Sequence, residues 1–143
     1  MLATDFDQPI GNWDVSSVTT MEDMFLYSSF NQPIGDWDVS NVTDMRFMFY
    51  YANAFNQPIG NWDVSSVTTM AGMFYYATSF NQPIGDWDVS SVTYMDSMFN
   101  NTPFNQNISS WSVDNVTYCL DFSTDAPLTE ANTPNFTNCT PLP

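Results

Sequence analysis

The stretch FNQPIGDWDVSNVTDMRFMF, residues 30–49, carries the main structural signal of the chain, because nearly the same sequence recurs at residues 55–74 and 80–99. Five successive units open on a phenylalanine, namely Phe6, Phe30, Phe55, Phe80 and Phe104, so the period is 24 or 25 residues. A fixed period of this size is typical of a solenoid, in which each repeat buries its apolar side only against its neighbours.

Each unit contains one strand-like and one helix-like phrase. Trp-Asp-Val-Ser predicts a short strand, since tryptophan and valine would point to one face and aspartate and serine to the other. Val-Thr-x-Met-x-x-Met-Phe has apolar residues at positions i, i+3 and i+4, which is helical spacing. Thr19 with Glu22 and Thr93 with Asp96 have the spacing of a capping box. We therefore expect an α/β-type solenoid with a short parallel β-sheet on one face and short helical turns on the other.

The repeat predicts a five-unit domain at residues 1–122, with units starting near residues 6, 30, 55, 80 and 104, and a non-repeat tail at residues 123–143. The chain opens on a variant of the FNQPIG phrase, which favours a mature product or a piece of a longer array. Cys119 and Cys139 are the only two cysteines. A disulfide that ties the tail to the last unit is the simple interpretation, and it implies an oxidising compartment; two unpaired buried thiols are the alternative.

The charge is one-sided: sixteen acidic residues stand against a single basic residue, Arg46, and the net charge is −15. Binding along a nucleic-acid backbone needs clustered basic residues, so we expect no nucleic-acid partner. Anionic membrane surfaces are disfavoured for the same reason. No apolar run is long enough to cross a bilayer, so we expect no membrane insertion. Cations and basic partners remain compatible with this charge.

Three further sets of residues recur through the units. The methionines of the Met-x-x-Met phrase could act as soft ligands for copper, but their spacing favours core packing. The asparagine after each opening phenylalanine could serve backbone groups of the neighbouring turn, with contact to a ligand as the alternative. The glycines that follow Pro-Ile favour a turn through their conformational freedom; they are Gly11, Gly35, Gly60 and Gly85.

The aspartate after each tryptophan is harder to explain by packing. Carboxylates stacked on adjacent strands would lie about 4.8 Å apart and repel one another. Calcium, which accepts flexible oxygen coordination, could offset that repulsion. The candidate ligands are Asp14, Asp38, Asp63, Asp88, Asp36 and Asp86. The alternative is a solvated acidic face whose carboxylates accept hydrogen bonds. No other cofactor is required.

Catalysis is not expected. With no histidine or lysine, only paired carboxylates remain as acid and base, and a repeated column makes their environments alike. Six Asn-x-Ser/Thr sequons would be available for glycosylation along a eukaryotic secretory route. They begin at Asn41, Asn100, Asn107, Asn115, Asn135 and Asn138.

The repeated motif Trp-x-Val-Ser-x-Val-Thr-x-Met-x-x-Met-Phe, followed by Phe-Asn-Gln-x-Ile, resembles the bacterial surface protein repeat of the BspA-like leucine-rich-repeat family. The resemblance covers residues 6 to about 122. It implies a leucine-rich-repeat-like, right-handed stack of coils outside the cell, usually linked to adhesion or protein binding and without enzymatic residues. The last unit departs from the motif at Ser112, Cys119 and Phe122, as a capping unit would.

Three functions follow as hypotheses. The first is a non-enzymatic extracellular or cell-surface module that binds a protein or glycan surface in adhesion. The second is a structural fibre, in which copies stack end to end through an uncovered first coil, because an exposed edge is a template for another copy. The third is ice binding by a column of threonines, namely Thr19, Thr43, Thr68, Thr93 and Thr117. Capping of helix starts would also explain these threonines.

Overall fold

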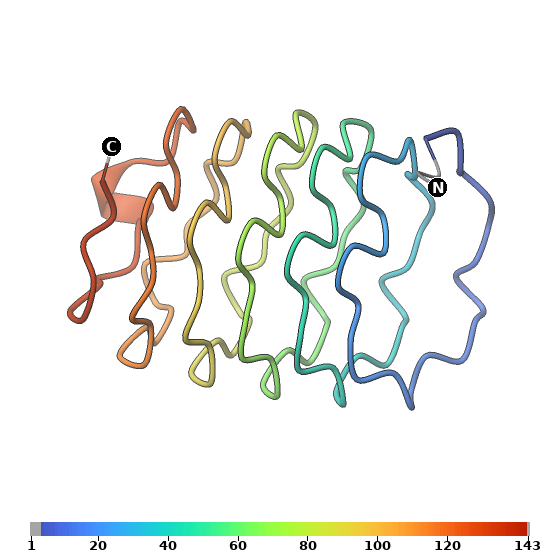
Figure 1. Cartoon of the computed structure of the whole chain (residues 1–143), viewed down its shortest axis with the longest axis horizontal. Coiled ribbons are helices and arrows are strands. Elements are labelled where there is room, and N and C mark those ends of the chain that lie inside the picture. The colour runs from blue at the N-terminus through green and yellow to red at the C-terminus, as the bar shows by residue number, and fades with distance from the viewer. Residues whose placement is uncertain (1–3, 143) are drawn as a thin grey trace.

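The structure, a computed structural model, describes residues 4–142. The repeats lie side by side along the long axis of the molecule, from the first repeat at one end to the C-terminal tail at the other (Figure 1). Residues 24 or 25 positions apart are joined repeatedly by backbone hydrogen bonds, such as Thr68 N–H to the Thr43 carbonyl oxygen at 2.8 Å. Each repeat therefore contacts the repeats before and after it.

Regular secondary structure is nearly absent from the part of the chain that the structure describes. Its only helix is the 3₁₀ helix η1, Glu130–Asn132, in the tail. Its only β-structure is a row of isolated parallel bridges that joins Thr20, Asp44, Thr69, Tyr94 and Tyr118. The predicted α/β-type solenoid, with a parallel sheet on one face and helical turns on the other, is therefore wrong. No helix among residues 4–142 is long and apolar enough to span a membrane.

The Trp-Asp-Val-Ser phrase is an irregular segment that enters a turn at its serine, in place of the predicted strand. The backbone N–H and the hydroxyl of Ser40 both donate to Oδ1 of Asp38, at 3.1 and 2.6 Å. Two residues further on, the Val42 N–H donates to the Val39 carbonyl oxygen at 2.9 Å. Aspartate and serine side chains offer the backbone local partners that compete with sheet pairing. The apolar alternation was real, but these local bonds bend the chain.

The Met-x-x-Met phrase is a series of turns in place of the predicted helix. Asp23 and Tyr27 have φ values of 60° and 56°, in the left-handed region. Asp23 is the third residue of a turn that closes where the Met24 N–H donates to the Met21 carbonyl oxygen at 3.2 Å. A right-handed helix needs negative φ at every residue, so a left-handed residue in each turn prevents it.

The predicted capping boxes fail for the same reason, because no helix starts at these threonines. The Glu22 N–H donates at 3.3 Å to the hydroxyl oxygen of Thr20, not of Thr19. The Thr43 hydroxyl donates at 3.2 Å to the Thr19 carbonyl oxygen of the preceding repeat. The threonine column therefore joins neighbouring repeats.

Backbone bonds between repeats run mainly in one direction along the turn segment. Four alternate N–H groups of the first repeat donate to carbonyl oxygens of the second: Met21 to Asp44, Asp23 to Arg46, Phe25 to Met48, and Tyr27 to Tyr50. The intervening N–H groups close turns within their own repeat. Since half of the donors are used locally, pairing between repeats stays at single bridges and no sheet forms.

Matching apolar columns fill the interior. The ring of Phe49 stacks on Phe55 with 3.9 Å between centroids and on Phe74 with 5.5 Å. Met45 and Met48 are completely buried in the same cluster. These contacts support the interpretation of the methionines as core residues, since a flexible thioether fills gaps between aromatic rings.

Glycine is required after Pro-Ile for close packing. The turn is present at Gly60, but a Cβ there would lie 2.6 Å from the carbonyl oxygen of Pro83 in the next repeat. Gly35 has the same relation to Pro58, at 2.7 Å. These glycines therefore serve the approach of two backbones, and not the left-handed conformation that glycine often supplies.

The tail packs on the last repeat. Cys119 occupies the position of the first methionine in the motif, is 1% exposed, and forms a disulfide with Cys139. The Ile108 N–H donates at 3.0 Å to the carbonyl oxygen of Asn132, the last residue of η1. Phe136 meets Phe122 edge to face, with 5.0 Å between centroids. The tail thus covers the end of the stack (Figure 1).

Candidate binding surface

The aspartate column has a structural role within each repeat. Asp14, Asp38 and Asp63 each accept two hydrogen bonds at Oδ1, one from the N–H and one from the hydroxyl of the serine two residues later. Asp88 accepts the corresponding N–H bond from Ser90 at 3.0 Å. The carboxylates are exposed and each is held locally, as in the predicted solvated acidic face.

The serine hydrogen bonds lower the pKa of three of these carboxyl groups. For Asp14, Asp38 and Asp88 the largest cause is the serine hydroxyl, followed by the serine N–H. Asp14 acts in the opposite direction on Asp38, because two like charges raise each other's pKa. The hydrogen bonds have the larger effect on the pKa, so the turn stabilises the ionised form of the carboxyl group.

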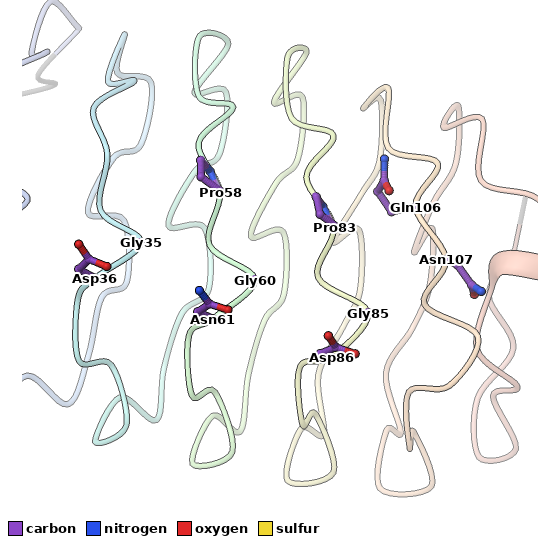
Figure 2. Close-up of a pocket in the computed structure, with 10 residues that line it drawn as sticks. All are labelled: Gly35, Asp36, Pro58, Gly60, Asn61, Pro83, Gly85, Asp86, Gln106 and Asn107. Atoms are coloured by element: carbon purple, nitrogen blue, oxygen red, sulfur yellow. The ribbon is translucent and has the colours of Figure 1, made fainter.

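The predicted calcium ligands do not converge. Asp36 and Asp86 line an open groove of about 590 Å³, but Asn61 stands between them at the corresponding point of the intervening repeat (Figure 2). Within residues 4–142, no three acidic, cysteine or histidine side chains come together in a way that could hold a metal ion. Calcium binding at the six aspartates stays a prediction that this geometry does not favour.

The asparagine column binds backbone, as expected from its structural interpretation. Oδ1 of Asn31 accepts the N–H of Asn56 at 3.0 Å, and Oδ1 of Asn56 accepts the N–H of Asn81 at the same distance. The glutamine that follows adds a bond: Nε2 of Gln57 donates to the Asn31 carbonyl oxygen at 2.9 Å. Asp7 takes the place of asparagine in the first repeat and accepts the Asn31 N–H.

The sequons differ in exposure. Asn100 is only 8% exposed, and its Oδ1 accepts a hydrogen bond from Nδ2 of Asn101. The other five sequon asparagines are exposed: Asn41, Asn107, Asn115, Asn135 and Asn138. Nδ2 of Asn41 donates at 2.8 Å to the carbonyl oxygen of Ser16 in the preceding repeat. Glycosylation stays a prediction, and the structure leaves room for it only at the five exposed positions.

An aromatic surface was missed by the sequence analysis. It consists of six partly exposed side chains, which we call the tyrosine surface: Tyr27, Phe47, Tyr50, Tyr51, Tyr75 and Tyr76. Five of them form two rows, one across three repeats and one across two, and Phe47 packs against the second row. Tyr27, Tyr51 and Tyr76 stack with centroids 4.9 and 4.7 Å apart. The signal in the sequence was the Tyr-Tyr pair at residues 50–51, which recurs at residues 75–76.

The second row of the tyrosine surface is just as closely packed. Tyr50 stacks on Tyr75 with 4.7 Å between centroids, and Phe47 meets Tyr50 edge to face at 5.5 Å. Partial burial, together with the neighbouring tyrosines, raises the pKa of Tyr50 and Tyr51. Since an unperturbed tyrosine titrates near about 10, these hydroxyl groups are neutral at physiological pH. Gly72 leaves room for Phe47, because a Cβ there would lie 2.6 Å from that ring.

The outer row occupies an unfavourable backbone position. Tyr27, Tyr51 and Tyr76 have φ values between 53° and 56°, where residues other than glycine pay about 1 kcal/mol or more. The next two residues of the same column are Asn101 and Asp125, which tolerate this region better. Packing of the core therefore does not require tyrosine at this position of the repeat.

Comparison with known proteins identifies a family. A family model described as "Mycoplasma protein of unknown function, DUF285" matches residues 1–64 and again residues 58–137. Searches of curated proteins and of solved structures found no match. Because the two matched segments together span most of the repeats and the tail, the chain belongs to the DUF285 family.

Proposed function

We propose that this protein is a non-enzymatic binding module that acts outside the cell or at its surface, where it attaches to a protein or glycan partner in adhesion. This is the function that the BspA-like repeat family, which the motif resembles, would imply. The tyrosine surface is the observation that carries the proposal. Tyrosine offers a large, rigid and amphipathic contact area and is enriched where proteins meet their partners.

The uniform aspartate column supports a non-enzymatic role. General acid and base pairs need carboxyl groups whose environments drive their pKa values apart. Asp14, Asp38 and Asp88 instead sit in equivalent turns, and the same serine contacts lower the pKa of each. The Cys119–Cys139 disulfide supports an extracellular or cell-surface location, because such bonds persist in oxidising compartments.

The proposal is tested by retention of the intact, fluorescently labelled protein on cells and extracellular matrix of its source. We expect the folded protein to be retained and a reduced, heat-unfolded sample not to be. A mutant lacking the gene should adhere less. If the folded protein stays in solution on every surface and the deletion leaves adhesion intact, the proposed function is wrong.

A second candidate, self-association into a fibre, is favoured by one exposed tryptophan. Trp13 in the first repeat is 54% exposed, whereas Trp62 is 3% exposed and donates its indole N–H to the Ile34 carbonyl oxygen at 3.0 Å. A second copy could cover Trp13. The tail packs on the opposite end, so continuous stacking would require it to move aside. Electron microscopy and light scattering over a range of concentrations distinguish fibres, pairs and monomers.

Ice binding, the third hypothesis, gains little from the threonine column. The Thr68 and Thr93 hydroxyl groups donate at 3.1 Å to carbonyl oxygens of the preceding repeat. These protons already have acceptors within the protein. A measurement of thermal hysteresis decides the question, since an ice-binding protein must produce it and a protein of the proposed kind must not.

A further inference from the structure

We infer that the tyrosine surface docks a positively charged protein segment and that arginine side chains of this segment stack on its tyrosine rings. This inference rests on the proposed function and narrows its partner to one chemical class. It follows from where the aromatic rows end, from the charges around them, and from the neutral tyrosine side chains that the rows present.

Both aromatic rows end at the same boundary between two repeats, which we call the row end: the one between the repeat of Tyr75 and Tyr76 and the next repeat. Tyr75 and Tyr76 stack on rings of the preceding repeat, at 4.7 Å in each case. In the following repeat their positions are taken by Asn100 and Asn101. Because asparagine is shorter than tyrosine, the outer part of each ring extends beyond it. A planar group can therefore lie flat against either ring, though not against both at once, because the planes of Tyr75 and Tyr76 are tilted by 50°.

A carboxylate, that of Asp125, lies close to the row end. Asp125 follows Asn101 in the same column, is exposed, and its Oδ2 lies 3.5 Å from Nδ2 of Asn101. A guanidinium group stacked on Tyr76 would therefore have a carboxylate within reach on the same edge of the molecule. Arginine suits such a place better than lysine, because its guanidinium is planar, weakly hydrated and stacks on aromatic faces.

The charge of the whole chain favours the same partner. The net charge is −15, and the single basic side chain, Arg46, is already engaged by Glu22 at 3.1 Å and Asp44 at 2.8 Å. Asp23, which shares a column with Phe47, adds an exposed carboxylate at the other end of the surface. A cationic segment would be drawn to this face, whereas acidic partners would be repelled.

The test uses the intact protein and three labelled peptides, alternating Arg-Gly, Lys-Gly and Ser-Gly, with fluorescence anisotropy at physiological salt. We expect the Arg-Gly peptide to bind most tightly and the Ser-Gly peptide not to bind. The decisive variant replaces Tyr50, Tyr51, Tyr75 and Tyr76 by asparagine. It copies the Asn100–Asn101 pair of the next repeat, leaves the net charge unchanged and should fold. It should weaken Arg-Gly binding about tenfold or more.

Two matched controls separate stacking from general charge. Tyr94 and Tyr118 form another exposed stacked pair, with 4.6 Å between centroids, in the separate column of Asp44 and Thr69, so their replacement by asparagine should change affinity by less than about twofold. Asp125→Asn should reduce the preference for arginine over lysine. Asp63→Asn removes the same charge from the aspartate column and should leave that preference intact.

The outcomes also separate this inference from the proposed function. If the tyrosine-to-asparagine variant is folded by circular dichroism yet binds Arg-Gly like the parent, net charge alone holds the peptide and the inference is wrong. If the parent is retained on native surfaces but binds no cationic peptide, the inference is wrong and the binding function stands. If the parent binds neither peptides nor surfaces, both fail.

Discussion

Individual residues of the repeat are selected by what the neighbouring repeat leaves room for and by which local hydrogen bonds they can make. Gly60 meets a backbone carbonyl of the next repeat, and Asp38 closes a turn on its own Ser40. Neither role is visible from hydrophobicity. Both can be tested by substitutions that change one atom group and leave the rest of the repeat intact.

Gly60→Ala is expected to destabilise the fold by about 1 to 3 kcal/mol, because the added methyl would lie 2.6 Å from the Pro83 carbonyl oxygen and the two repeats would have to separate. The measurement is denaturant unfolding followed by circular dichroism. Ser66→Ala, at an exposed position in the same repeat, is the control and should be nearly neutral. Equal stability of the two variants would contradict the close backbone contact.

The aspartate column predicts a dependence of stability on pH. In Asp14, Asp38 and Asp88 the folded-state pKa is lower than the unfolded value of about 3.9. The stabilisation is therefore complete above that pH and is lost as the pH falls through the lower folded-state pKa. The melting temperature of the parent protein should fall in this acidic range and stay nearly constant around neutral pH.

A triple variant checks the cause. Asparagine can close a turn of this kind, since Oδ1 of Asn107, at a different position of the repeat, accepts both the N–H and the hydroxyl of Ser109, at 3.0 and 2.7 Å. Because asparagine lacks the charge of the ionised aspartate, Asp14→Asn/Asp38→Asn/Asp88→Asn should melt below the parent at pH 7 and lose less stability in acid. A calcium-dependent rise in melting temperature seen only in the parent would show that the carboxylates bind a cation, and an equal loss of stability in acid by the variant would show that these aspartates are not its cause.

At the scale of the repeated element, columns of identical side chains connect each repeat to the preceding one. The indole N–H of Trp87 donates to the Ile59 carbonyl oxygen at 3.1 Å, and the Trp87 ring stacks on Trp62 with 6.4 Å between centroids. The column explains why the tryptophan never varies within this chain: it supplies both core volume and the hydrogen bond that a buried backbone carbonyl needs.

Trp87→Phe should lower the free energy of unfolding by about 1 to 3 kcal/mol, since the Ile59 carbonyl oxygen loses its buried donor and the smaller ring leaves space. Trp13→Phe is a matched control, because Trp13 is 54% exposed while Trp87 is 4% exposed. It should change stability by less than about 0.5 kcal/mol. If the two variants are equally destabilised, the indole hydrogen bond is not a significant source of stability.

At the scale of the whole molecule, the two ends of the stack differ. The tail is held on the last repeat by the disulfide between Cys119 and Cys139, 20 residues apart, and by the edge-to-face contact of Phe136 with Phe122. The disulfide limits the freedom of the unfolded chain and keeps the tail over the apolar core. The first repeat exposes Trp13 instead.

Replacing both cysteines by serine should reduce the free energy of unfolding by about 3 kcal/mol, the loop-closure entropy for this separation. Limited proteolysis should then cleave the tail first, because the last repeat no longer holds it. The measurement combines denaturant unfolding with mass spectrometry of the early fragments. Unchanged stability with first cleavage inside the repeats would show that the tail contributes little.

The sequence by itself determined the repeat, its period and the residues of the core, because every repeat must present the same apolar cross-section to the next. The role of the asparagine column followed from the same stacking requirement. Secondary structure did not follow. Alternation and i, i+3 spacing are shared by strands, helices and consecutive turns, and only the folded chain shows that Asp38 bonds to Ser40 and that Asp23 takes a positive φ.

The candidate surface likewise depended on tertiary structure. Tyr51 and Tyr76 are 25 residues apart in sequence, and only the packing of their repeats brings the two rings to 4.7 Å. The same packing places Asn61 between Asp36 and Asp86, which separates carboxylates that the sequence analysis had grouped around a cation (Figure 2). A repeated sequence determines which residues align in columns, while the backbone path decides which columns reach solvent and which side chains meet there.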